Sequence, residues 1–415
     1  MEKRAIIVQR RTRFERDLLK ELKELAEAAG YKVVCSLTQI RASSASYNIG
    51  KGKVLELKKL VKKFNVDRVI FFNELKPGQA YNLQRELGVE VIDRFELILE
   101  IFASRAGSRE AKLQIELARL KRELSMIREY IHRVKIGELQ GFMGGGRYAI
   151  DAYYRHVTKR ISLIEECLEK IRKMKDARWR KRAFTGLYSV ALTGYTGAGK
   201  TTLFNAFTGL NEYSDGKPFA TLSTKVRRVS IKGRPFLISD TIGFIDSLPE
   251  LLLDAFYTTL GELLYSDLII LVLDISEELE EIKRKLEASL ETLSRLSIPF
   301  NHLVLAANKI DLIDHEELSG RMKLLSKYGL DIVPISAAKK YGLDELGEKL
   351  IEKLPSYVSI RLSVPRNEKE VLEKLKSNCY VRDTFSFNGR IVLYVEGKKE
   401  WIDSFIKRNS FVKLA

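Results

Sequence analysis

Short apolar runs alternate with helical patterns along the first 94 residues. The apolar runs cover residues 5–8, 31–37, 68–72 and 89–92, and amphipathic stretches cover residues 14–29, 53–64 and 80–87. Strands that alternate with helices in this way build a parallel sheet with helices packed over it. We therefore predict an N-terminal α/β domain over residues 1–94.

Residues 95–182 carry a different pattern, in which apolar residues recur at alternating steps of four and three. That spacing is typical of a coiled-coil seam. The apolar positions are Leu113, Leu117, Leu120, Leu124, Ile127, Ile131 and Val134, then Tyr154, Val157, Ile161, Ile164, Leu168 and Ile171. A glycine-rich segment over residues 137–147 separates the two stretches, and no helix is expected to cross it. The pattern predicts an antiparallel helical hairpin with a glycine-rich tip.

Two further domains are predicted beyond the hairpin. Residues 183–355 hold strand-like runs at 187–192, 303–307 and 331–335, a hairpin about Gly233, and a helix over 202–207. Residues 356–415 show the order β-α-β-β-α, with paired strands about Asn388-Gly389. This order is typical of a small ferredoxin-like α+β domain, and nothing in it indicates chemistry. The whole chain is thus expected to be an α/β multidomain protein.

Candidate chemistry begins with residues 194–201, which match G-x-x-x-x-G-K-[ST]. In this pattern backbone N–H groups wrap phosphates, the lysine reaches the outer phosphates and the hydroxyl ligates Mg²⁺. The loop lies between a predicted strand and a predicted helix, so the helix N-terminus faces the anion. Lys200 is therefore a catalytic candidate and Thr201 a candidate metal ligand.

Four later segments follow in the order that a Ras-like P-loop G domain uses: Thr221 and residues 240–243, 308–311 and 336–339. Asp240 ends a predicted strand and is expected to reach the metal through water. Gly243 can offer its backbone N–H to the γ-phosphate, which makes it the second catalytic candidate. A carboxylate at Asp311 can accept two N–H groups of guanine, a pairing that adenine cannot offer. The sequence therefore predicts GTP rather than ATP.

The residues expected to contact the nucleotide are taken from these segments. They are Gly194, Tyr195, Thr196, Gly197, Ala198, Gly199, Lys200, Thr201, Thr202, Thr221, Asp240, Thr241, Ile242, Gly243, Asn308, Lys309, Ile310, Asp311, Ser336, Ala337 and Ala338. Their chemistry is that of a Mg²⁺-dependent GTPase with GTP as substrate and GDP as product.

Charge adds a second partner. The net charge of +17 and the isoelectric point near 9.5 indicate an acidic partner, which is most often nucleic acid or a membrane surface. Basic residues concentrate between residues 170 and 182, where Asp176 is the single acid. A solvated helix face is the alternative to contact with RNA phosphates. The residues predicted to contact RNA are Lys170, Arg172, Lys173, Arg178, Arg180, Lys181 and Arg182, together with Arg147 at the hairpin tip.

Length and composition bound the remaining possibilities. A chain of 415 residues with 45% hydrophobic residues is long enough for two to four packed domains. No apolar run reaches the length of a membrane span, and the N-terminus lacks a signal-peptide core. We therefore expect a cytoplasmic monomer. Cys35, Cys167 and Cys379 lie far apart without metal-ligand spacing, so inert thiols are expected.

Five segments carry a family resemblance: residues 49–53, 105–117, 194–200, 219–222 and 240–244. In these segments the chain resembles the HflX family of GTPases, and the resemblance extends from about residue 15 to 355. It implies binding to the large ribosomal subunit and its rRNA, and in bacterial members the splitting of stalled ribosomes. It also implies that a first switch segment holds Thr221 as a metal ligand and catalytic residue. That segment would bring Phe219, Ala220, Leu222 and Ser223 to the nucleotide.

The sequence departs from the family pattern at two places. The hairpin tip has Gly144-Gly-Gly-Arg147 where many members have G-x-R-G-P-G-E-T-x, and Gly197 replaces an asparagine in the phosphate loop. An archaeal-type member is one interpretation. Phe244 also stands where Ras-like enzymes commonly place a water-orienting glutamine, so slow intrinsic hydrolysis is expected.

Three functions remain open from the sequence. The first is a ribosome-stimulated GTPase that remodels or dissociates ribosomes, and the second is a switch in which GTP only licenses docking. The third makes the N-terminal domain an ATP-dependent RNA-remodelling module, with residues 50–53 as a phosphate loop; an ordinary helix start is the alternative there. Nucleotide-dependent ribosome binding separates the first two from the third.

Overall fold

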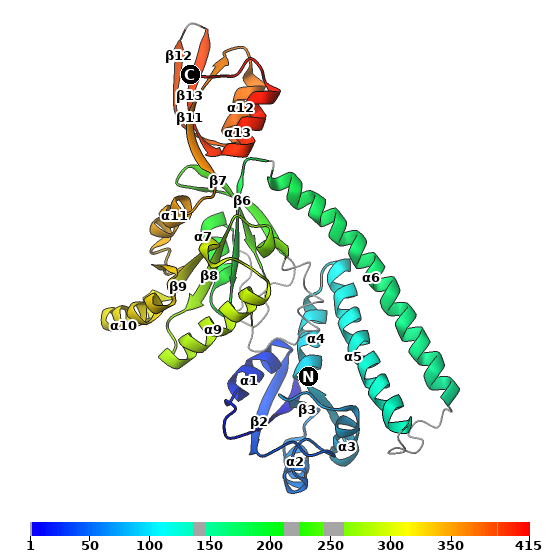
Figure 1. Ribbon diagram of the computed structural model, residues 1–415. Coiled ribbons are helices and arrows are strands. Elements are labelled where there is room, and N and C mark those ends of the chain that lie inside the picture. The colour runs from blue at the N-terminus through cyan, green and yellow to red at the C-terminus, as the bar shows by residue number, and fades with distance from the viewer. Residues whose placement is uncertain are drawn as a thin grey trace. The chain divides into compact units, whose positions relative to one another are not determined.

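The protein is described by a computed structural model (Figure 1) that covers residues 2–135, 147–183, 185–210, 224–241, 243–244, 261–387 and 389–415. The chain divides into two compact units, one reaching from the N-terminus to Glu169 and the other holding most of the chain from Lys170 onward. Each unit is described by itself. None of the helices in the ranges above is long and apolar enough to cross a membrane.

The first unit begins with a parallel sheet in the order β2-β1-β3-β4. Its core is formed by buried residues such as Ile6, Leu57 and Phe71. The predicted N-terminal α/β fold is confirmed. The elements are β1 (Lys3–Arg11), α1 (Leu19–Ala28), β2 (Tyr31–Ile40), α2 (Lys51–Phe64), β3 (Arg68–Phe71), α3 (Pro77–Leu87) and β4 (Glu90–Asp93).

Long helices follow the sheet, and the last of them belongs to this unit as far as Glu169 and to the second unit from Lys170 onward. They are α4 (Arg94–Arg105), α5 (Arg109–Lys135) and α6 (Arg147–Ala183), and α6 runs back alongside α5 in Figure 1. The predicted seam packs Leu117 and Leu124 against Val157, Ile161 and Ile164. Because these apolar residues occupy one stripe on each helix, burying the stripe stabilises the pair. The predicted tip over residues 137–146 lies outside the described residues.

The second unit contains a central sheet whose described strands follow the order β10-β9-β8-β5-β7-β6. All neighbouring strands are parallel except β6 and β7, which form the predicted antiparallel hairpin about Gly233. The elements are β5 (Tyr188–Gly194), α7 (Lys200–Thr208), β6 (Lys225–Ile231), β7 (Arg234–Asp240), β8 (Leu268–Asp274), α9 (Leu279–Arg295), η1 (Phe300–His302), β9 (Leu303–Asn308), η2 (Ile310–Leu312), α10 (His315–Leu325), η3 (Ser326–Tyr328), β10 (Asp331–Pro334) and α11 (Leu343–Glu352).

The C-terminal domain is an antiparallel sheet in the order β12-β13-β11-β14, with two helices on one of its faces (Figure 1). Its core is formed by residues such as Leu362, Leu375, Leu393 and Trp401. The predicted α+β fold is confirmed, and β14 adds a strand that the sequence pattern did not indicate. The elements are β11 (Tyr357–Pro365), α12 (Lys369–Asn378), β12 (Tyr380–Phe387), β13 (Arg390–Lys398), α13 (Lys399–Arg408) and β14 (Lys413–Leu414).

Ion pairs join the C-terminal domain to the end of the central sheet where β5 and β7 begin, which we call the amino edge. Lys398 Nζ lies 2.7 Å from the Asp267 carboxylate, which also accepts hydrogen bonds from the Ser189 N–H and hydroxyl. Arg234 pairs with Glu396 at 2.5 Å. Charged groups with so little exposure to water require such partners. The ion pairs therefore fix the orientation of the two domains at this edge.

Candidate functional site

The candidate site lies at the opposite end of the central sheet, which we call the carboxyl edge. Strands β5, β7, β8 and β9 are parallel, so their final residues meet there. In open α/β sheets ligands bind outside the carboxyl ends of the strands. The predicted nucleotide segments at residues 194–201, 240–243 and 308–311 follow three of these strands.

The phosphate loop between β5 and α7 depends on glycine at two positions. Gly194 has φ +136°, and a Cβ atom there would lie 2.1 Å from the Val272 carbonyl oxygen. Gly199 has φ +97°, and a Cβ atom would lie 2.3 Å from the Asn308 amide nitrogen. Residues with side chains disfavour this part of backbone space. The two glycines thus allow the loop to fold tightly over the ends of β8 and β9.

Lys200 crosses the inside of this loop. Its Nζ donates hydrogen bonds to the carbonyl oxygens of Gly194 at 3.1 Å and Tyr195 at 2.9 Å. The side chain is buried, and burial lowers the pKa of the ammonium group to about 8, although the nearby Asp240 carboxylate opposes this shift. A cation deprived of water in this way is strongly favoured to meet an anion. Lys200 is therefore placed to contact phosphate.

Thr201 and Asp240 lie together behind the loop. The Thr201 hydroxyl donates to the Asp240 carboxylate at 3.0 Å, and both residues are buried. Hard oxygen ligands of this kind fit Mg²⁺, which takes one or two protein oxygens and completes its shell with phosphate and water. Among the residues that the structure describes, no group of three His, Cys, Asp or Glu side chains is arranged around a common metal position. The donor set thus fits Mg²⁺.

The segment after β7 is joined to the phosphate loop by backbone pairing. Phe244 N–H donates to the Gly194 carbonyl at 2.9 Å, and Thr196 N–H donates to the Phe244 carbonyl at 2.8 Å. A Cβ atom on Gly243 would lie 2.7 Å from Lys200 Nζ. The Phe244 side chain is buried, and it has no polar atom with which to orient an attacking water molecule. The pairing leaves Gly243 next to Lys200.

The phosphate loop and the loop after β10 are both held by Asn308, the last residue of β9. Its amide nitrogen donates to the Ala198 carbonyl at 2.8 Å, and its Oδ1 accepts from the Ala337 N–H at 2.9 Å. Asn308 is buried, whereas the Asp311 carboxylate is exposed. A single side chain therefore connects the phosphate loop to the loop that begins at Ser336. This leaves Asp311 accessible for a ligand.

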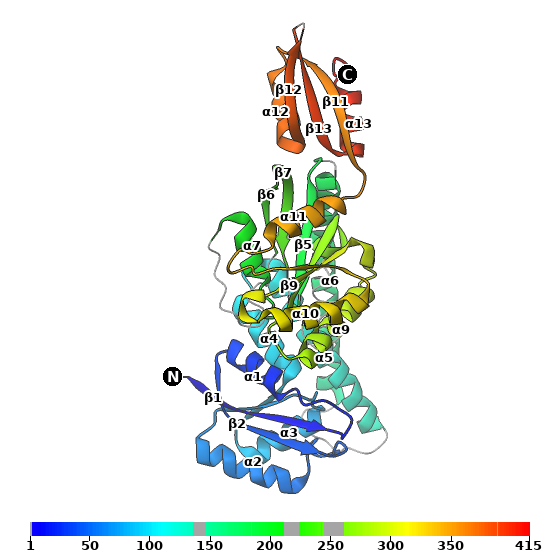
Figure 2. The same cartoon turned by 90° about the vertical axis from the view of Figure 1, so that its left-hand side faces the viewer.

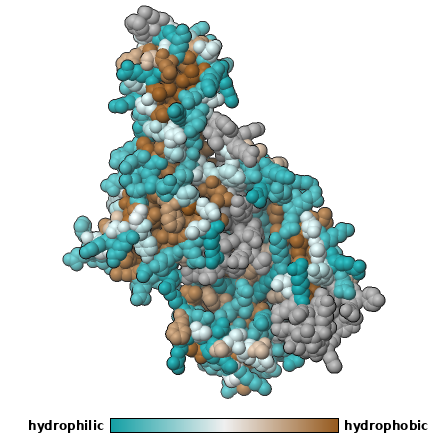
Figure 3. Space-filling model, viewed as in Figure 1, coloured by the Kyte–Doolittle hydropathy of each residue, from teal (hydrophilic) through white to brown (hydrophobic). Residues whose placement is uncertain are grey.

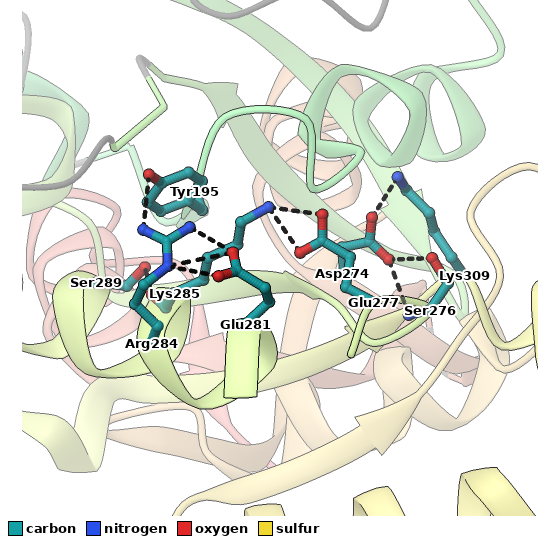
Figure 4. A network of polar contacts seen from close by, with 9 residues as sticks. All are labelled: Tyr195, Asp274, Ser276, Glu277, Glu281, Arg284, Lys285, Ser289 and Lys309. Atoms are coloured by element: carbon teal, nitrogen blue, oxygen red, sulfur yellow. Dashed lines mark hydrogen bonds and ion pairs between the residues drawn. The ribbon is translucent and has the colours of Figure 1, made fainter. Parts of the chain in front are cut away.

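A polar network behind these loops was missed in the sequence (Figure 4). Arg284 on α9 lies 3.4 Å from the Tyr195 hydroxyl, and Lys285 lies 4.9 Å from the centre of the same ring. Lys309 Nζ pairs with Asp274 at 2.5 Å. Asp274 ends the fully buried strand β8, and an apolar run that closes on an aspartate was the available signal. The network supports the phosphate loop from the side of α9.

Several predicted residues cannot be placed from the structure. Phe219, Ala220, Thr221, Leu222, Ser223 and Ile242 lie outside the described residues, as do the side chains of Arg147, Arg180, Lys181 and Arg182. Lys170, Arg172, Lys173 and Arg178 are exposed on α6, so their predicted contact with RNA stays a prediction.

The end of α6 is anchored by Trp179. Its ring stacks on Tyr265 at 4.5 Å between centroids, and it is buried. Tyr265 also donates its hydroxyl to the Asp176 carboxylate at 3.1 Å. The single acidic residue of the basic run, Asp176, therefore has a structural role, because its carboxylate accepts a hydrogen bond from Tyr265. The contacts with Tyr265 therefore fix the C-terminal part of α6, which carries the exposed basic residues.

The segment 50–53 forms the first turn of α2. Gly50 is the N-cap residue, and its N–H donates to the Gln39 side chain at 2.8 Å. Lys51 and Gly52 are exposed there. The arrangement is that of a helix start, and its alternative interpretation as a phosphate site stays untested.

Comparison with known proteins assigns most of the chain. Families described as "GTP-binding GTPase N-terminal" and "GTP-binding GTPase Middle Region" match residues 16–103 and 105–182, and one described as "50S ribosome-binding GTPase" matches residues 189–309. The chain is 55% identical to the GTPase HflX of Thermofilum pendens over 96% of this chain and 95% of that protein. It is 40% identical to the GTPase HflX of Thermococcus kodakarensis over 97% and 92%.

A solved structure is also similar. It is described as a complex of SsGBP with GDP, is 31% identical and has a TM-score of 0.52. The match covers 84% of this chain and 98% of that one. The organisation found in this chain is therefore shared with a protein that has been seen with a guanine nucleotide.

Proposed function

The chain belongs to the HflX family of GTPases, and from this we propose that it binds the large ribosomal subunit and uses GTP hydrolysis to remodel or dissociate ribosomes. The observation that carries the proposal is the meeting of Lys200, Asp240 and Asn308 at the carboxyl edge of the central sheet. Asp240 and Asn308 end strands β7 and β9, and Lys200 begins helix α7 behind the phosphate loop that follows β5. The protein acts in the cytoplasm and is partly ribosome-associated.

Each residue at the edge has a role in this proposal. Lys200 contacts the outer phosphates, while Thr201 and, through water, Asp240 hold Mg²⁺, with Thr221 of the first switch as a further ligand. Bound Mg²⁺ neutralises charge that develops on the phosphates during transfer. Asp311 accepts the N–H groups of guanine. The buried Asn308 holds the loops on which these groups stand.

The buried Phe244 predicts a slow enzyme. Gly243 can donate its N–H to the γ-phosphate, but no water-orienting side chain follows it at position 244. Unstimulated GTPases of this kind turn over at about 10⁻⁴ to 10⁻² s⁻¹. A group supplied by the ribosome would then complete the site, so that hydrolysis occurs mainly on the ribosome.

Cosedimentation with purified ribosomal subunits tests the partner. The protein is mixed with large or small subunits in the presence of a non-hydrolysable GTP analogue, GDP or no nucleotide. We expect most binding to large subunits with the analogue, and faster GTP hydrolysis when ribosomes are added. Equal binding to both subunits in all nucleotide states would contradict the proposal.

A GTP-gated docking switch is the second candidate, because the loop after β7 pairs directly with the phosphate loop. In this case hydrolysis only resets the protein, so the non-hydrolysable analogue should be as effective as GTP in separating subunits. Light scattering of intact ribosomes distinguishes the two. Dissociation that requires hydrolysis favours remodelling, and dissociation with the analogue alone favours the switch.

The basic end of α6 is tested by charge removal. Replacing Arg178, Arg180, Lys181 and Arg182 with Gln should weaken ribosome binding and flatten its salt dependence, since each lost phosphate contact removes roughly 0.7 to 0.9 of log-log slope. Deleting residues 141–147 should leave partial binding but reduce stimulated hydrolysis. An unchanged slope in the four-glutamine variant would show that the run is only a solvated face.

A further inference from the structure

The C-terminal sheet has one face that its own helices do not cover. Helices α12 and α13 pack against the side formed by Ile360, Leu362, Leu393 and Val395 (Figure 1). The opposite side belongs to the alternate residues of the same strands, because successive side chains of a strand point to opposite faces. In Figure 2 the strands of the C-terminal sheet lie in front of its helices, so this side of the sheet faces the viewer. We call the outer part of this side the open face, defined by Arg361, Ser363, Phe385, Val392 and Tyr394.

A β-bulge brings Phe385 onto the open face. Val381 pairs with Val395 and Thr384 pairs with Leu393, so β12 carries one extra residue between these pairs. Without the extra residue, the alternation would direct residue 385 toward the same side as the core residue Val381. With it, Phe385 lies opposite Val392 and is 57% exposed. Bulges often re-aim a side chain in this way.

Aromatic and guanidinium groups gather around Phe385. Its ring meets the ring of Tyr394 edge-on, with 6.0 Å between centroids. The Arg361 guanidinium lies 4.6 Å from the centre of the Tyr394 ring. Arg361 and Tyr394 are direct partners on the neighbouring strands β11 and β13. Two rings and one planar cation therefore stand side by side on the sheet.

Charge on the open face is mainly positive. The basic residues on this side are Arg361, Arg390 and Lys413. Lys413 lies on β14, where it pairs with Ser363 of β11. Of the seven acidic residues after residue 355, five lie on or just before the two helices, and Asp383 lies at the bulge. The last, Glu396, is paired with Arg234 of the β6–β7 hairpin. Asp383 lies 3.9 Å from Arg382 at the bulge, so basic residues outnumber acidic ones on this side of the sheet.

One end of this side of the C-terminal sheet is covered by Arg234 of the β6–β7 hairpin, and the open face begins beyond it. Tyr380 and Glu396 contact Arg234, with 4.5 Å between the guanidinium and the centre of the Tyr380 ring. Tyr380 and Glu396 pair with each other at the end of β12 and β13 that lies away from Phe385. Hydrophobic residues also reach the surface of this domain in Figure 3.

We propose that the open face binds single-stranded RNA, with bases stacked on Phe385 and Tyr394 and the backbone held by Arg361 and Lys413. Every base has a π-face, so stacking on aromatic side chains tolerates any sequence, and basic groups beside the rings supply the phosphate contacts. A duplex hides its base faces and gains nothing from the rings. The ligand is defined without the ribosome, so the proposal goes beyond the function above and can fail independently of it.

Binding of an oligonucleotide to the full chain tests the proposal. The probe is a fluorescein-labelled twelve-nucleotide oligouridylate, followed by fluorescence anisotropy, with a twelve-base-pair RNA duplex as the comparison. Phe385→Ala and Tyr394→Ala should each weaken binding of the single strand by about five- to a hundredfold and leave duplex binding unchanged. Phe300→Ala is the matched control, because Phe300 is 45% exposed in η1.

Conservative variants separate stacking from other contacts. Phe385→Tyr keeps the ring and should bind as the parent does, whereas Phe385→Leu keeps apolar area without a π-face and should bind as weakly as Phe385→Ala. Arg361→Gln should lower the salt slope for the single strand by about 0.7, and Arg361→Lys should restore it. If the Phe385→Leu variant bound the single strand as tightly as the parent, no base would be stacking on residue 385 and the proposal would be overturned.

Photocrosslinking locates the contact on the chain. Ultraviolet irradiation of the complex followed by trypsin should attach nucleotide to the peptides 383–390 and 391–398, which contain Phe385 and Tyr394. Unchanged thermal unfolding and GTP hydrolysis in the variants show that the fold is intact. Crosslinks confined to other peptides, or equal affinity of the parent for single strand and duplex, would overturn the proposal.

Discussion

The two edges of the central sheet carry buried polar groups for different reasons. At the carboxyl edge, Lys200 and Asn308 bond mainly to the backbone of neighbouring loops. At the amino edge, Asp267 and Arg234 bond to side chains of another domain, 131 and 162 residues further along the chain. The first arrangement fixes the conformation of loops around a ligand site, and the second holds the C-terminal domain against the sheet.

The difference lies in what satisfies each charge. Lys200 is a buried cation whose partners in the protein are chiefly carbonyl oxygens, and its pKa is lowered accordingly. Lys398 is a buried cation paired with the carboxylate of Asp267. A buried charge that the fold does not neutralise with an opposite charge indicates function, whereas one that it does neutralise indicates structure. Substitutions at the two edges should therefore separate activity from stability.

The largest expected effect is on catalysis. Lys200→Ala should lower GTP turnover by at least about a thousandfold, since it removes the cation that meets the phosphates. Phosphate release with Mg²⁺ measures this, and thermal unfolding should change little. Cys167→Ser serves as the control and should hydrolyse GTP as the parent does. If the Lys200→Ala variant hydrolysed GTP as fast as the parent, the assignment of residues 194–201 as the phosphate loop would be wrong.

Base recognition should respond next. Asp311→Asn replaces one carboxylate oxygen with an NH2 donor and should weaken GTP binding roughly a hundredfold, because one of the two guanine N–H groups loses its charged acceptor and meets a donor instead. The same variant should gain affinity for xanthosine triphosphate, which presents an oxygen where guanine has an amine. Competition with a fluorescent nucleotide measures both. A variant that binds the two nucleotides as the parent does would show that the base lies elsewhere.

The amino edge should respond in stability instead. Lys398→Met breaks a largely buried ion pair and should cost about 2 to 4 kcal/mol in the free energy of unfolding, with GTP affinity unchanged. Denaturant unfolding measures the loss. Lys399→Met is the matched control, because Lys399 is exposed on the next residue. A similar loss in both variants would mean that the pair with Asp267 contributes little.

The smallest effect is expected at a more exposed ion pair of the same edge. Asp331, the first residue of β10, has its pKa lowered chiefly by a hydrogen bond from Lys353. Because the pair is partly exposed, Asp331→Asn should cost at most about 1 kcal/mol at pH 7. A lowered carboxyl pKa stabilises the fold above the ordinary value of 3.8, and the benefit is lost as the pH falls below it. Parent and variant should therefore unfold alike near pH 2.

The sequence predicted that the residues of the carboxyl edge lie near strand ends, because these residues are grouped in short motifs. Gly194, Lys200, Asp240 and Asn308 each lie within a few residues of a strand end, and their spacing follows from local geometry. The fold class could be predicted for the same reason, since periodicity is local. The family was also found from these motifs.

The sequence could not predict contacts that join distant segments. The Lys398–Asp267 pair has no local signal, because each residue alone resembles an ordinary surface charge. Asp274 was missed because strand β8 was not identified. The bulge in β12 was missed because pairing with β13 shifts the alternation that a single strand would show, and so the C-terminal domain gave no sign of chemistry.

The separation of the two edges along the chain also sets the order in which a newly synthesised protein can complete them. The last nucleotide loop of the sheet holds Ala337, and Lys398 is made some sixty residues later. At about 5 to 20 residues per second, that interval is roughly 3 to 12 s. The emerging chain can therefore assemble its nucleotide pocket while Asp267 still faces water. GTP or GDP in the cell would then bind to the central sheet and stabilise it before the C-terminal domain is synthesised and packs against the amino edge.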